Sequence, residues 1–136
     1  MALVGGGIGG ASNTVNPSGT GTSLNYIGNF VYGYAGPVAT GGTGSADVTA
    51  LKFATGAEII KCTVAFCDDG GGSADKLMKI ELDNQAVWDA RYTDNSTLAS
   101  EQPLPFIIPP HSRVTIFVGS ATTDNISLML VGELYA

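Results

Sequence analysis

The stretch AEIIKCTVAFCD, residues 57–68, alternates between apolar and more polar side chains with a period of two. In an extended chain, one face would carry Ile60, Cys62, Val64 and Phe66. The opposite face would carry Lys61, Thr63 and Ala65. Successive side chains of a β-strand point to opposite faces of the sheet, so this pattern predicts a strand with one face in a protein core.

The same period recurs along the chain on both sides of this stretch. Residues 76–83 place Met78, Ile80 and Leu82 inward and Lys79 and Glu81 outward. Residues 86–93 place Trp88, Ala90 and Tyr92 on one face and Asp89 and Arg91 on the other. Further strands are expected over residues 26–34, 47–53, 104–108, 113–119 and 126–135. A hairpin turn is expected at residues 83–85.

About eight short strands and no helix are therefore expected. Turn signals every 8 to 15 residues are typical of an all-β sandwich or jelly roll. We expect a jelly-roll β-sandwich of about eight antiparallel strands, and an immunoglobulin-like sandwich is the competing architecture. A chain of 136 residues fits one domain and is long enough to bury a core without disulfides.

The charge of the chain excludes several classes of partner. The net charge is −6 and the six basic residues are scattered, which argues against nucleic acid. No apolar run of membrane-spanning length occurs, so a membrane is not expected as a partner. We see no signal-peptide pattern, and we expect synthesis in a cytoplasm.

Charged side chains are confined to residues 47–136, while residues 1–46 have none. We expect residues 1–25 to form an extended, glycine-rich arm that lies against another protein, and residues 26–136 to form the sandwich. A flexible Gly/Ser tail is the alternative. The candidate residues for a capsid or oligomer interface are Leu3, Val4, Ile8, Val15, Leu24 and Tyr26.

The segment GGGIGG, residues 5–10, matches a dinucleotide-binding fingerprint by its letters alone. That fingerprint needs a buried strand before it and a helix after it. Only residues 1–4 precede it, and turn-forming residues 11–19 follow. We therefore expect no nucleotide site and no cofactor.

Few residues are candidates for catalysis or metal binding. Cys62 and Cys67 lie on opposite faces of one expected strand, so they cannot form a disulfide with each other. His111, the only histidine, is expected in a surface turn. These three residues fall short of a zinc site, and we expect neither catalytic nor metal-binding residues.

Two other groups of side chains have both a functional and a structural interpretation. The acidic loop at residues 68–75 has oxygen ligands that suit Ca²⁺, or it is simply solvated. Trp88 and the tyrosines form either a sugar-binding platform or part of the core and of subunit contacts. The tyrosines are Tyr26, Tyr32, Tyr34, Tyr92 and Tyr135.

Several short runs resemble small virion proteins of tailed bacteriophages. These are the opening MALVGGG with the Gly/Ser/Asn stretch after it, and GTSLNYIG at residues 21–28. The runs IPPHSRVTI (residues 108–116) and SLMLVGELY (residues 127–135) look like the last hairpin of jelly-roll proteins on viral capsids.

The resemblance implies a capsid decoration, or cement, protein without enzymatic activity. Such proteins typically sit on the outer surface of the shell as trimers, bind the major capsid protein and grip it through an extended arm. Residues 1–25 are the matching candidate here. A receptor-binding tail or spike module, with a loop over residues 92–100 that grips host glycans, is the first alternative. A cellular β-sandwich hydrolase or lectin is the second.

Overall fold

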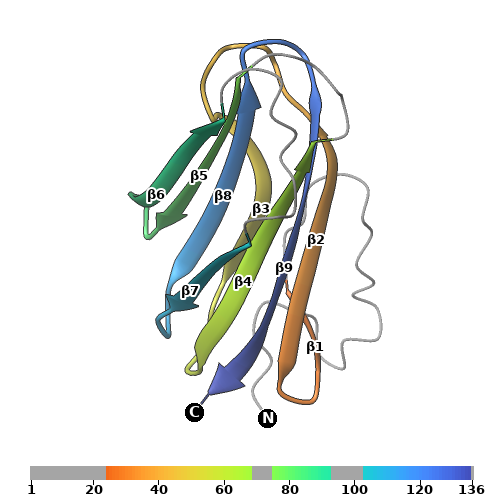
Figure 1. Ribbon diagram of the computed structural model, residues 1–136. Coiled ribbons are helices and arrows are strands. Elements are labelled where there is room, and N and C mark those ends of the chain that lie inside the picture. The colour runs from red at the N-terminus through yellow and green to blue at the C-terminus, as the bar shows by residue number, and fades with distance from the viewer. Residues whose placement is uncertain (1–23, 69–74, 93–102, 136) are drawn as a thin grey trace.

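The computed structural model describes residues 24–68, 75–92 and 103–135, which fold into two β-sheets packed face to face (Figure 1). None of these residues is helical. Their nine strands are β1 (Asn25–Ile27), β2 (Phe30–Ala39), β3 (Val48–Ala54), β4 (Ile59–Asp68), β5 (Lys76–Leu82), β6 (Gln85–Tyr92), β7 (Leu104–Ile108), β8 (Arg113–Ser120) and β9 (Asn125–Tyr135).

The strand order is that of a jelly roll. One sheet has the order β1-β2-β9-β4-β7 and the other the order β3-β8-β5-β6. Every neighbouring pair is antiparallel, and the pairs are nested: β2 with β9, β3 with β8, β4 with β7, and β5 with β6. An eight-stranded hairpin wrapped into two sheets gives this order. The expected jelly-roll sandwich is confirmed, and β1 adds a short edge strand to it.

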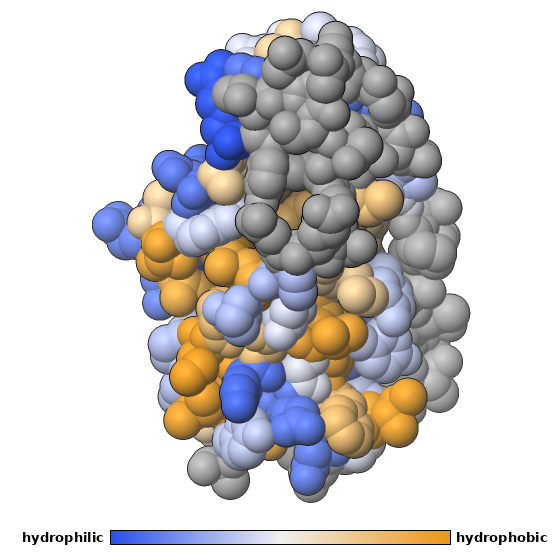
Figure 2. Space-filling view, in the orientation of Figure 1, coloured by the Kyte–Doolittle hydropathy of each residue, from blue (hydrophilic) through white to orange (hydrophobic). Residues whose placement is uncertain are grey.

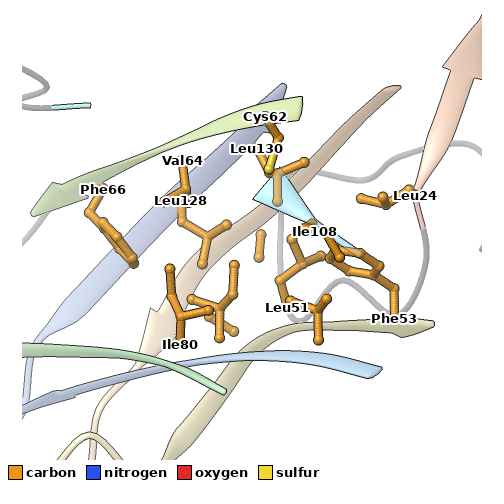
Figure 3. Close-up of a cluster of buried hydrophobic side chains, with 14 of the residues drawn as sticks. Leu24, Leu51, Phe53, Cys62, Val64, Phe66, Ile80, Ile108, Leu128 and Leu130 are labelled. Atoms are coloured by element: carbon orange, nitrogen blue, oxygen red, sulfur yellow. The ribbon is translucent and has the colours of Figure 1, made fainter. Parts of the chain in front are cut away.

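The core lies between the two sheets and is built from the inward faces of both. Figure 3 shows Cys62, Val64 and Phe66 of β4 directed toward Leu51 and Ile80 of the opposite sheet. The inward face expected for residues 57–68 is therefore confirmed. Burial of a large apolar side chain such as Leu51 or Phe66 contributes about 1.5–3 kcal/mol. The alternation of apolar residues therefore strongly determines the register in which the strands pair.

The first strand ends earlier than the sequence pattern predicts. Residues 26–34 read as one strand, but the chain turns back at Gly28 and Asn29 and so forms β1 and β2. Gly28 has φ = 61°, which a residue without a Cβ adopts easily. The hairpin expected at residues 83–85 is present, with Asp83 and Asn84 between β5 and β6 at positive φ.

A buried ion pair links the two sheets at one end of the sandwich. Lys76 Nζ at the start of β5 lies 2.5 Å from Asp124 Oδ2, and their side chains are 0% and 3% exposed. No other hydrogen-bond donor reaches this oxygen from the described residues. Thr40, after β2, donates its N–H to Asp124 O (2.8 Å), and its hydroxyl accepts from Asp124 N (3.0 Å). Asp124 therefore joins the ends of β2 and β5.

Candidate interaction surface

The outward-facing residues of β1, β2, β9, β4 and β7 form one continuous surface, which we call the outer sheet face. Alternation that sends one set of side chains into the core sends the other set to this face. Large apolar groups are unusually exposed here: Ile27 is 69%, Ile107 62% and Phe30 59% exposed. The other exposed apolar residues of the face include Met129, Val131 and Tyr135.

The strand register arranges these residues in rows across the sheet. One row runs Phe30, Glu133, Lys61, Ile107 across β2, β9, β4 and β7. Adjacent strands lie about 4.8 Å apart, so the members of a row are direct neighbours. The next row runs Tyr32, Val131, Thr63, Pro105.

Two shallow depressions lie on the outer sheet face. The first has a volume of about 660 Å³, and its lining includes Tyr32, Thr63 and Val131. The second, of about 500 Å³, is lined in part by Ala65 and Met129, and Tyr34 borders both. Figure 2 shows hydrophobic residues (orange) beside a smaller hydrophilic group (blue) in the lower part of the view, where Figure 1 places β7, β4, β9 and β2. The surface is thus largely apolar and gently hollowed.

Two opposite charges lie side by side near one end of this face. Lys61 and Glu133 are register partners on β4 and β9 and carry opposite signs. No ion pair holds Lys61 within the described part of the chain. The Tyr135 hydroxyl donates a hydrogen bond of 2.7 Å to Glu133 Oε2. This bond and the charge of Glu133 raise the pKa of Tyr135.

The structure places the expected interface residues in two groups. Leu24 is completely buried in the protein's own core, and Tyr26 packs against that core. These two residues serve the fold, and the sandwich begins at Leu24, before the boundary expected at residue 26. The remaining four lie outside the described residues: Leu3, Val4, Ile8 and Val15. The GGGIGG segment also lies outside them.

Among the described side chains, Trp88 lies apart from the tyrosines of the outer sheet face. Trp88 of β6 is half-buried and stacks on Phe66 with 6.2 Å between ring centroids, so it serves the core. Tyr32 and Tyr34 lie on the outer sheet face with their ring centroids 5.8 Å apart. The side chain of Tyr92 lies outside the described residues. The structural interpretation thus holds for Trp88.

The polar candidates are separated from one another. His111 is exposed in the turn before β8, as expected. Its backbone N–H donates a hydrogen bond to the carbonyl oxygen of Gly56 (2.8 Å). Arg91 pairs with Asp75 rather than with Asp89, and its Nε lies 2.8 Å from Asp75 Oδ2. Most of the acidic loop, residues 69–74, lies outside the described residues. Among residues that the structure describes, no three His, Cys, Asp or Glu side chains gather as metal ligands do.

The two cysteines are expected to differ strongly in reactivity. Cys67 is exposed on the outer sheet face, whereas Cys62 is buried and burial raises its pKa to about 12. Only the thiolate attacks a disulfide reagent. At pH 8 a thiol reagent should therefore modify one cysteine rapidly in the folded protein and both in urea.

The Cys67→Ser variant is the control for this thiol measurement, because it should abolish the fast phase. Equal rates for both thiols in the folded protein would contradict the burial of Cys62.

The burial of Cys62 also makes the stability of the fold depend on pH. Since the folded-state pKa of Cys62 is raised, its contribution to stability should be fully present below about pH 9 and lost as the pH rises from there toward about 12.

Comparisons of the chain with models of known protein families and with curated proteins find no match. The structure has no helix in its described residues that is long and apolar enough to cross a membrane.

Proposed function

We propose that the protein is a structural, non-enzymatic virion protein that decorates and stabilises a viral capsid. It is made in the host cytoplasm, binds the shell of major capsid protein from outside and acts as a homo-oligomer. The observation that carries this proposal is the outer sheet face. It exposes Phe30, Ile107 and Met129 to solvent, and contiguous apolar surface of this kind marks sites where proteins meet.

The distribution of charge supports a role in assembly as well. Residues 1–46 contain no charged side chain, so their burial against another protein requires no desolvation of an ionised group. Extended segments also bind by adding a strand to a neighbouring sheet edge. We assign shell attachment to residues 1–23, because Leu24 belongs to the core of the sandwich. The resemblance to virion proteins of tailed bacteriophages points the same way.

The copy number of this chain in purified particles tests the proposed location. A decoration protein should approach the copy number of the main shell protein, measured by quantitative mass spectrometry. A few copies per particle would instead indicate a tail or spike component, and binding to a glycan array would then favour receptor recognition. Absence from particles would rule out a virion role.

Deletion of residues 1–23 should weaken shell binding at least tenfold and leave the sandwich folded. Binding should fall because the proposed attachment segment is missing. The sandwich should stay folded because the deleted segment precedes Leu24, which is buried in the core. Binding is measured by co-sedimentation with undecorated shells, and folding by the urea midpoint. A full-length variant with Leu3, Val4, Ile8 and Val15 changed to serine separates apolar contacts from length. Unchanged binding by the deletion variant would contradict arm-mediated attachment.

A further inference from the structure

We propose that the outer sheet face binds the same face of a second copy of this chain about a two-fold axis. In that dimer, Lys61 of each copy lies opposite Glu133 of the other. This inference rests on the proposed function only in assigning the face to a protein partner. It names that partner and gives a dimer where the resemblance implies a trimer. It does not depend on the shell.

The size of the face suits such a contact. Five strands about 4.8 Å apart give a width of about 20 Å, and a strand as long as β9 spans roughly 35 Å. A face of these dimensions covers at most roughly 700 Å², so two copies would bury up to about 1,400 Å² in total, within the range of about 1,200–2,000 Å² for specific interfaces. Two sheets packed face to face are also a common arrangement within single proteins, with a separation of about 10 Å.

The row that carries both charges lies near one end of the strands, and it is chemically symmetric about its midpoint. Its order is apolar, acidic, basic, apolar: Phe30, Glu133, Lys61, Ile107. Consider a two-fold axis that lies between the stacked sheets and runs parallel to the strands, between β9 and β4. It places β9 opposite β4 and β2 opposite β7 of the second copy. Glu133 then faces Lys61, and Phe30 faces Ile107, in both directions across the interface.

The second row obeys the same symmetry. The axis places Tyr32 opposite Pro105 and Val131 opposite Thr63 of the second copy. Each of these pairs brings an apolar or weakly polar group against another, and none brings two like charges together. The arrangement that satisfies the charged row therefore also suits the row beside it.

The net charge of the chain opposes self-association in general, but it does not oppose contact through this face. The chain has twelve acidic and six basic residues, so two copies repel each other on average. Within the row that contains Lys61 and Glu133, one acidic and one basic residue cancel. Lys61, which has no ion-pair partner among the described residues, gains one in the dimer. Two such pairs form at once, because a two-fold contact repeats every interaction.

Charge exchange tests the dimer directly on the full chain. Sedimentation equilibrium should give twice the chain mass for the wild type. Lys61→Glu and Glu133→Lys should each weaken self-association at least tenfold, because each homodimer then opposes like charges. An equimolar mixture of the two variants should dimerise again, since each altered residue then faces an opposite charge.

Lys52→Glu is the matched control, because Lys52 is an exposed residue of β3 in the other sheet. It makes the same change in net charge and should leave the dimer intact. Thermal melts check that all variants fold. A monomeric or trimeric wild type would overturn the inference, as would a mixture that stays monomeric or a control that dissociates as strongly. If the chain is a monomer and still decorates shells, the dimer is refuted and the proposed function stands. If the chain is a dimer and is absent from particles, the virion role is refuted and the dimer stands.

Discussion

Replacing Lys76 with methionine is expected to lower the free energy of unfolding by about 3–5 kcal/mol. The ammonium group of Lys76 is completely buried and lies 2.5 Å from Asp124 Oδ2, the side chain of which is 3% exposed. Methionine fills nearly the same space but leaves the Asp124 carboxylate buried without its counter-charge. Urea denaturation of the variant and the wild type measures the difference.

The double variant Lys76→Met/Asp124→Asn should recover most of this loss. It removes both charges, and the asparagine Oδ1 still accepts the hydrogen bond of 2.8 Å that Asn125 N donates to Asp124 Oδ1. Lys52→Met is the control, because Lys52 is exposed and its replacement should change stability by no more than about 0.5 kcal/mol. A loss below about 1 kcal/mol in the single variant would show that the pair is not buried as described.

Gly119→Ala is expected to cost about 3 kcal/mol, because the added methyl group has no space. A Cβ at Gly119 in β8 would lie 1.8 Å from Ser45 O and 2.8 Å from the Cα of Ala46. Both are backbone atoms, so no side-chain rotation relieves the contact. The segment before β3 must move instead, and with it the hydrogen bond of 3.1 Å from Gly44 N to Ser120 O.

Gly41→Ala provides the comparison for Gly119→Ala. The nearest atom to its added Cβ is Thr43 Cγ2 at 3.7 Å, which is an ordinary contact, so stability should hardly change. Differential scanning calorimetry of both variants gives the two melting temperatures. Equal melting temperatures would mean that the segment at Ser45 does not lie against β8 in solution.

The sequence predicts the strands well where a single face is buried. In β4, the apolar residues from Ile60 to Phe66 define both the strand and its inward face, because burial penalises a shift by one residue. The prediction fails where a turn lies inside an alternating run, as at Gly28. Lys76 has the same parity as Met78 and is indeed inward. Its partner Asp124 is distant in the chain, so no local pattern reveals the pair.

The outer sheet face was not predicted, although the sequence carries a signal for it. Strands β7 and β9 have apolar residues on both faces, for example Ile107 beside Ile108 and Met129 between Leu128 and Leu130. A strand that is apolar throughout fits either burial on both sides or an apolar surface. Only the tertiary structure distinguishes the two, by showing which sheet has no further layer of described residues on its outer side.

The position of β9 between β2 and β4 determines when the chain can fold during its synthesis. Among the described strands β9 is the last to be translated, yet it pairs on both sides in the middle of its sheet. At a translation rate of roughly 5–20 residues per second, β2 waits on the order of ten seconds for this partner. During that time, the apolar faces of β2 and β4 are exposed on a nascent chain that cannot yet close its sheet. The sandwich therefore folds after translation of β9, and chaperones that bind apolar segments are expected to hold the chain until then.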